Sequence, residues 1–191
     1  MAEWIHQHIS EAADLFAGLR DDEFATGSIT HIVEVVVERL RAGGKVLTCG
    51  NGGSASDAQH LSQELVGKYR APRQSLPAIC LNADGAALTC IGNDFGFDAI
   101  FSRQVEALAN KGDVVMVFST SGRSPNIVAA LEAARARGAT TVGLLGRNGG
   151  DAAKLCDYSV VVPHTESARI QEVHGLMLHL ICEALDRAFK E

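Results

Sequence analysis

The sequence predicts an α/β fold in which helices cover both faces of a parallel sheet. Short apolar, β-branched runs alternate with helical patterns along most of the 191 residues. Runs that are apolar on both faces suit strands covered on both sides, and strand–helix alternation is typical of parallel sheets. We therefore predict a three-layer αβα sandwich with a five-stranded parallel sheet, its strands at 45–49, 77–82, 113–119, 140–145 and 158–162.

Glycine and proline mark where the helices between these strands begin and end. Gly43 and Gly44 predict the end of the helix before the first strand. Ser124 and Pro125 predict the N-cap and first turn of the helix after the third strand, and Gly138 predicts its end. No internal repeat, low-complexity tract or long linker interrupts the pattern, so we expect a single domain over residues 1–191.

Two terminal helices lie outside the alternation. The last, at about 168–189, is apolar almost all round between Leu176 and Cys182, and such a helix is usually buried on several sides. The first has an apolar seam with spacings of four and three, which is typical of a helix packed against another helix. We expect both helices to pack in a homo-oligomer. The seam consists of Ile5, Ile9, Ala12, Phe16 and Leu19.

The charge and the hydropathy of the sequence argue against two classes of binding partner, nucleic acids and membranes. The net charge is −6 and no run of Lys or Arg is present, which argues against binding to nucleic acid or to an anionic membrane. No stretch of about 18 apolar residues occurs, so we expect a cytoplasmic protein with no membrane partner. The five cysteines are scattered and odd in number, and we expect them to be reduced core residues.

A glycine turn follows the first strand, in the segment CGNGGSASDAQHLSQE at 49–64. Gly50, Gly52 and Ala55 fit the G-x-G-x-x-G/A pattern of dinucleotide-binding proteins, but Asp84, the nearest candidate for the ribose-binding acid, comes too late. No GK[ST] follows, so a P-loop is excluded. What the turn offers is backbone N–H groups and Ser54 at a helix N-terminus, where an anion is favoured.

A hydroxyl-rich segment follows the third strand, and it comprises Ser119, Thr120, Ser121 and Ser124. Ser and Thr are also ordinary turn and cap residues, and for Ser124 alone the two interpretations are equally good. The whole cluster favours a ligand, because open α/β sheets bind ligands at the carboxyl ends of their strands.

We expect a loop at 92–96, where Asn93 and Asp94 offer an amide and a carboxylate. Asp94 could bind sugar hydroxyls. Its spacing alone favours a turn residue.

Two predicted helices each carry a pair of candidate ligands. His60 and Glu64 are four residues apart and share a helix face, whereas Gln171 and His179 are eight residues apart, about 80° around a helix. If the helices face one another, the four side chains suit a divalent metal such as zinc. His60 and Glu64 could equally be a surface pair, and His179 a core histidine. The role of His174 stays open.

The motifs together resemble the sugar isomerase (SIS) domain family and, within it, the phosphoheptose isomerases. The resemblance rests on CGNGGSA, the AQH helix ending at Glu64, IGNDFG, FSTSG with Ser124, and RIQEVH followed by His179, and it covers nearly the whole chain. It implies an aldose–ketose isomerase that converts sedoheptulose 7-phosphate to D-glycero-D-manno-heptose 7-phosphate in ADP-heptose and lipopolysaccharide core precursor synthesis. It also implies a homotetramer and one Zn²⁺ per active site.

The resemblance also implies roles for individual residues. Zinc would be held by His60, Glu64, Gln171 and His179, and Glu64 and His179 would be the acid and base in an order left open. Two departures, Lys68 where an arginine can occur and Ala168 where some members carry an acid, bear on substrate contacts. The sugar phosphate would be held by Asn51, Gly52, Gly53, Ser54, Glu64, Asn93, Asp94, Ser119, Thr120, Ser121, Ser124 and Gln171.

Three other functions are weighed against the isomerase. A non-catalytic SIS protein, like the relative that associates with the replication initiator, would not need both Glu64 and His179. A phosphosugar-sensing module would need only the hydroxyl-rich segment. A nucleotide-dependent oxidoreductase is disfavoured because its ribose-binding acid is misplaced.

Overall fold

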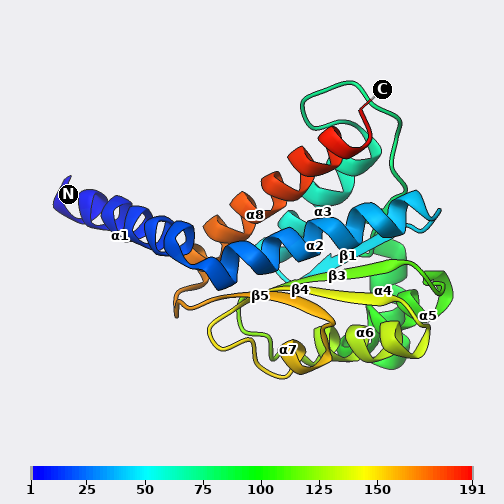
Figure 1. Cartoon of the computed structure of the whole chain (residues 1–191). Coiled ribbons are helices and arrows are strands. Elements are labelled where there is room, and N and C mark those ends of the chain that lie inside the picture. The colour runs from blue at the N-terminus through cyan, green and yellow to red at the C-terminus, as the bar shows by residue number, and fades with distance from the viewer. Residues whose placement is uncertain (1, 191) are drawn as a thin grey trace.

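The computed structural model describes residues 2–190, and its centre is an all-parallel five-stranded sheet with strand order β2-β1-β3-β4-β5 (Figure 1). This confirms the predicted α/β class. The edge strand β2 is shorter than the predicted 77–82 and pairs with β1 over three residues. The strands are β1 (Val46–Gly50), β2 (Ala78–Cys80), β3 (Val114–Ser119), β4 (Thr140–Gly146) and β5 (Tyr158–Val162).

Helices cover both faces of the sheet, as the predicted three layers require (Figure 1). One face carries α2 (Glu23–Arg41), α3 (Gly53–Val66) and α8 (Ser167–Ala188). α1 (Ala2–Asp21) leads into α2 and projects away from the body. The other face carries α4 (Gly85–Phe95), the 3₁₀ turn η1 (Phe97–Ala99), α5 (Ser102–Leu108), α6 (Pro125–Ala136) and α7 (Ala152–Leu155).

The central strand shows how the sheet joins two apolar cores. Every residue of β3 is buried, and its side chains alternate between the faces. Met116 and Phe118 belong to the core under α2, α3 and α8, whereas Val115 and Val117 belong to the core above α5 and α6. A strand apolar on both faces is therefore the direct signature of this arrangement.

The predicted helix ends are confirmed, with one correction. Gly43 and Gly138 both have positive φ just beyond α2 and α6. The segment 92–96 is wrong as a predicted loop, because 92–95 form the last turn of α4. The side chain of Asp84 caps this helix by accepting hydrogen bonds from the amides of Ala86 and Ala87, and the helix continues until Gly96, where φ is +88°.

The cysteine prediction is correct in part. All five thiols are free, and Cys49 and Cys182 are buried. Cys90 is wrong as a core residue, because it lies on the exposed face of α4, where its thiol donates to Asp94. Across residues 2–190, none of the helices combines the length and the apolar character that crossing a membrane requires.

The chain order of the strands creates a switch point between β1 and β3. From β1 the chain passes through α3 to β2 on one side, and the later strands β3, β4 and β5 extend the sheet on the other side. Open α/β sheets bind ligands outside the carboxyl ends of strands at such a point. The glycine turn follows β1 and the hydroxyl-rich segment follows β3, so the fold places both at the switch point.

Candidate active site

A reciprocal pair of amides joins the glycine turn to the helix after the hydroxyl-rich segment. The side-chain amide of Asn51 donates to Oδ1 of Asn126 at 2.9 Å, and that of Asn126 donates back to Oδ1 of Asn51 at 2.9 Å. Asn126 is buried at the start of α6. The two anion-binding elements predicted separately from the sequence thus form one continuous wall.

Asn82, a residue that the sequence analysis did not select, fixes the backbone of the glycine turn. Asn82 accepts a hydrogen bond from the amide of Gly50 at 3.1 Å and donates to its carbonyl at 2.9 Å. Gly50 cannot carry a side chain, because a Cβ would overlap the carbonyl of Ser54. Gly52 has φ of +58°, and Ser54 is buried in the first turn of α3. The signal for Asn82 was its place at the end of the second strand.

The side chain of Gln171 rests against the start of α3. A Cβ added to Gly53 would lie 2.5 Å from Nε2 and 2.8 Å from Oε1 of Gln171. Real Cβ atoms do not approach other atoms so closely, so the contact requires glycine. The predicted convergence of the two helices is therefore present at this pair.

In the hydroxyl-rich segment, three of the four hydroxyl groups form hydrogen bonds that order the turn, and that of Ser124 does not cap the following helix. Oγ of Ser119 accepts from the amide of Gly122, and Oγ of Ser121 accepts from the amide of Arg123. Ser167, at the start of α8, donates to Oγ1 of Thr120 at 3.2 Å. Ser124 is the N-cap of α6 by position, but its side chain makes no capping hydrogen bond. Its hydroxyl is free to bind a ligand.

His60, Glu64 and His179 lie together between α3 and α8. Nε2 of His60 is 3.3 Å from Oε1 of Glu64, and the rings of His60 and His179 meet edge to face with centres 5.2 Å apart. Burial raises the pKa of Cys182 to about 12, and the negative charge of Glu64 adds to this, which places the Glu64 carboxylate beside α8. The sequence-predicted facing of the two helices is confirmed.

These contacts agree with the geometry of a zinc site but do not complete one. In tetrahedral zinc centres the ligand atoms lie about 2.0–2.2 Å from the metal, which puts two of them about 3.3 Å apart and two bound imidazole centres about 5 Å apart. Both measured separations match. Within the described chain, however, no three His, Cys, Asp or Glu side chains are grouped closely enough to hold an ion together. The carboxylate and imidazole groups suit zinc. To hold the ion together, the side chains of Glu64 and His179 would have to move closer to each other.

Two further side chains at this cluster were missed by the sequence reasoning. Asp57 lies one turn before His60 on α3, and its half-buried carboxyl group has Oδ2 without a hydrogen-bond partner among residues 2–190. Burial raises the pKa of Asp57 to about 6, against a lowering effect of His60. Tyr69 stacks on His179 with ring centres 5.5 Å apart. The spacing of three between Asp57 and His60 was the available signal.

A buried ion pair holds the far ends of α3 and α8 together. Arg73 bonds Asp186 of α8 at 2.8 Å and also donates to the carbonyls of Glu64 and Leu65 on α3. Burial alone would raise the pKa of Asp186, but hydrogen bonds from Ala71, Arg70 and Arg73 lower it overall. The pair fixes the two helices against each other, and with them Glu64 and His179.

Asn93 and Asp94 are not brought to these residues. They lie on the exposed last turn of α4, where the amide of Asn93 donates to Asp94 at 2.7 Å. The helix starts at the carboxyl end of β2, so eight residues carry Asn93 about 12 Å along the helix from that edge of the sheet. Their predicted contact with substrate is not provided by the described interactions of one chain.

Comparison with known proteins identifies the family. The SIS domain model matches residues 7–146. The chain is 51% identical over 155 residues to the phosphoheptose isomerase of a Nitratiruptor species, a match that covers 81% of this chain and 83% of the relative. It is 46% identical to phosphoheptose isomerase 1 of Campylobacter jejuni, over 98% of this chain and 96% of the relative. The chain belongs to the phosphoheptose isomerase family.

The solved structures agree with this assignment. The structure of phosphoheptose isomerase GmhA from Neisseria gonorrhoeae matches with a TM-score of 0.91 at 39% identity, over 97% of this chain and 98% of that chain. The resemblance inferred from the motifs is thus confirmed. The oxidoreductase alternative loses its remaining support, because the carboxylate of Asp84 is engaged in capping α4.

Proposed function

We propose that this chain isomerises sedoheptulose 7-phosphate to D-glycero-D-manno-heptose 7-phosphate. The observation that carries the proposal is the contact between His60 of α3 and His179 of α8, with Glu64 paired to His60. Relatives that carry the name phosphoheptose isomerase support the choice of substrate. Neither a replication-associated nor a sensing role would need this arrangement of an acid and two imidazoles.

The phosphate of the substrate binds at the wall formed by the glycine turn and the hydroxyl-rich segment. Ser124 supplies a hydroxyl that is not used for capping, and Thr120 and Ser121 lie in the same turn. The N-termini of α3 and α6 both begin at this wall, and helix N-termini stabilise anions. Binding here directs the sugar toward Gln171, which lies against the first residue of α3.

The reaction moves a carbonyl group from C2 to C1 through an enediol. A base removes a proton from C1, a proton returns to C2, and the two oxygens exchange a proton. Glu64 and His179 are the two groups of the cluster suited to these transfers, one from each helix. The His60–Glu64 contact and the stacking of Tyr69 on His179 fix the orientation of both.

We further propose that His60, Glu64, Gln171 and His179 hold one Zn²⁺. When bound, zinc acts as a Lewis acid that polarises the carbonyl oxygen and stabilises charge developing on it. Gln171, whose side-chain amide rests against Gly53, would supply the fourth ligand. His60 already lies within ligand-to-ligand distance of both Glu64 and His179.

The proposal extends to the assembly and the pathway. The exposed apolar residues of α1 and α8 support a homo-oligomer, which we propose to be a tetramer in the cytoplasm. In such an assembly Asn93 and Asp94 could complete the site of a neighbouring subunit, which would account for their distance from it here. The product would then enter ADP-heptose synthesis for the lipopolysaccharide core.

The deciding experiment is incubation with sedoheptulose 7-phosphate in deuterated water. We expect an aldose heptose 7-phosphate to form, with deuterium at C2 where the transferred proton exchanges with solvent. Glu64→Gln and His179→Gln should each lower kcat by about 10²-fold or more, since each removes a proton-transfer group, while substrate binding measured by calorimetry persists. Recovery of unchanged ketose, or near-normal rates in both variants, would refute the proposal.

A further inference from the structure

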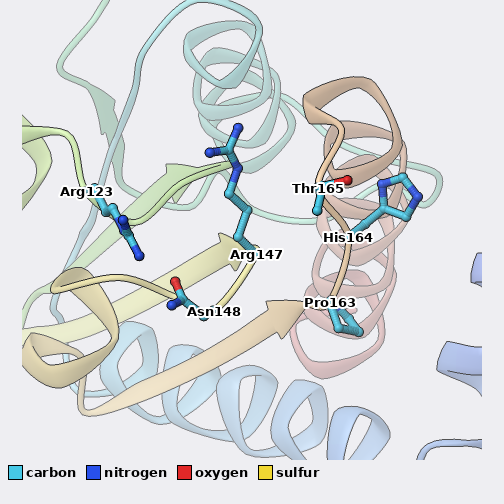
Figure 2. A pocket seen from close by; sticks show the side chains of 6 residues that line it. All are labelled: Arg123, Arg147, Asn148, Pro163, His164 and Thr165. Carbon is cyan, nitrogen blue, oxygen red and sulfur yellow. The ribbon is translucent and has the colours of Figure 1, made fainter.

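A cavity of about 340 Å³ lies on the other side of the hydroxyl-rich segment from the glycine turn. It opens at the carboxyl ends of β4 and β5, and Figure 2 shows Arg147 rising from the end of β4 between Arg123 and His164. A second hollow of about 310 Å³ shares Arg123 and Asn148 with the first. The first cavity is lined by Arg123, Arg147, Asn148, Pro163, His164 and Thr165.

The cations at this cavity are not neutralised by the chain. Among residues 2–190, the guanidinium groups of Arg123 and Arg147 form no hydrogen bond or ion pair. Asp151, the nearby acid, is bonded to Lys154 at 2.8 Å, which lowers its pKa, and Arg123 adds only a weaker electrostatic effect. In a chain of net charge −6, two unpaired arginines at one cavity form a local anion-attracting site.

His164 and Asn148 add neutral donors. Nδ1 of His164 accepts a hydrogen bond from the amide of Glu166 at 3.1 Å, so the neutral ring carries its proton on Nε2 and can donate. Asn148 faces Arg123 in Figure 2 and carries a further N–H donor. Guanidinium and amide donors at one hollow are groups that recognise phosphate oxygens.

The backbone at Arg147 is held in an unfavourable conformation. Its φ is +58°, which makes it the one residue other than glycine with positive φ between positions 2 and 190. Glycine or asparagine would adopt the same positive φ with less conformational strain. A chain that needs only a turn here would not require arginine, so the strain indicates a use for the guanidinium.

The cavity is coupled to the hydroxyl-rich segment through backbone contact. A Cβ on Gly122 would overlap the carbonyl of Gly149, and a Cβ on Gly150 would overlap the carbonyl of Gly122. The amide of Ala152 also donates to the carbonyl of Gly122 at 2.9 Å. The loop that carries Arg147 and Asn148 is therefore fitted directly against the turn that carries Arg123.

We propose that Arg123, Arg147 and Asn148 form a second anion site, which binds the phosphate group of a small molecule separately from the hydroxyl-rich segment. The site does not depend on isomerase activity. Since the two loops interlock, its occupant contacts the structure that holds the substrate phosphate. The chemistry fits free phosphate and a phosphorylated metabolite equally, so both are tested.

Calorimetric titration with inorganic phosphate tests the proposal without turnover. Wild-type protein should bind two phosphates per chain, and Ser124→Ala should weaken one of them. Arg147→Asn and Arg123→Gln should each weaken the other by about tenfold or more, because a charged hydrogen bond is lost. Arg187→Gln, the same charge change at the far end of α8, should leave both intact. A parallel titration with sedoheptulose 7-phosphate distinguishes free phosphate from a phosphorylated sugar as the occupant.

Arg147→Asn separates a ligand role from a structural one. Asparagine tolerates positive φ, so this variant should be as stable as wild type or more so, while still losing the second phosphate. One phosphate per chain in wild type, or equal binding by wild type, Arg123→Gln and Arg147→Asn, would overturn the proposal. Either result leaves the isomerase proposal untouched, because that is judged by aldose formation.

Discussion

The imidazole of His174 lies in the core, where α8 crosses the end of β4. It is fully buried, its Nε2 bonds the carbonyl of Leu145 at 3.1 Å, and its ring meets Phe118 edge to face. Nδ1 has no partner among residues 2–190. Burial lowers the pKa of His174 to about 4, against a raising effect of the Leu145 hydrogen bond. The ring is therefore neutral at physiological pH.

We predict that His174 makes the fold less stable in mild acid. Between pH 6.5 and pH 4 the unfolded chain binds a proton at this position that the folded chain does not, so the free energy of unfolding falls as pH falls. The loss between pH 7 and pH 5 should be about 2 kcal/mol. His174→Gln keeps a donor for Leu145 but cannot titrate. Urea unfolding of both proteins in chelator at the two pH values measures the difference, and equal losses would contradict the prediction.

Some residues of the site were accessible from the sequence, and others were not. His60, Glu64, Gln171 and His179 were found because helical spacing and family motifs both point to them. Asn126 and Asn82 each act through two hydrogen bonds to a residue distant in the chain, at 2.9–3.1 Å from Asn51 and Gly50. No periodicity encodes such contacts, since they exist only after the strands have paired.

At the scale of elements, the approach of α3 to α8 depends on the absence of one methyl group. Gly53 is the first residue of α3, and the amide of Gln171 occupies the space where its side chain would be. Gly85 is the first residue of α4 and has open space around the same position. The two glycines begin helices after neighbouring strands, so they form a matched pair for substitution.

We predict that Gly53→Ala impairs catalysis without unfolding the protein. The new methyl group must displace Gln171, whose side chain is flexible, so the loss should appear as at least about tenfold in kcat/KM. Thermal unfolding should change little, because alanine itself favours a helix by about 0.4–1 kcal/mol. Gly85→Ala should keep full activity. Normal kcat/KM in Gly53→Ala would show that the position of Gln171 does not matter.

The strands were predicted well because the hydrophobic pattern determines their positions. The extent of α4 was predicted less well because helix capping determines it. All five strands fall within the predicted runs or within one residue of them, because each packs apolar side chains against at least one of the two cores. The two glycines and two turn-forming residues of the segment 92–96 predict a loop. A capping carboxylate at Asp84 and a strong helical start override that local preference as far as Phe95.

At the scale of the whole molecule, α1 is the least covered part of the structure. None of its residues is buried, and it projects from the body in Figure 1. Trp4, Ile5 and Ile9 are exposed at 56%, 43% and 64%, and Leu176 and Leu180 of α8 at 42% each. A helix of 20 residues with an apolar seam has little reason to stay folded in water by itself, since helical stability in proteins comes mostly from packing. Within one chain, therefore, Phe16 and Leu19 of the seam pack against the core, whereas Ile5 and Ile9 stay exposed.

We predict that this seam holds the oligomer together and that Ile9→Asp weakens it. Covering an isoleucine contributes about 1.5–3 kcal/mol, so a charge in its place should raise the subunit dissociation constant about tenfold or more. Light scattering after gel filtration should then show smaller particles on dilution than for wild type. Ser10→Asp adds the same charge about 100° around α1 from Ile9, outside the seam, and should keep the wild-type mass. If Ile9→Asp assembles like Ser10→Asp at every concentration, α1 is not the contact, and the exposed face of α8 must be tested through Leu180→Asp instead.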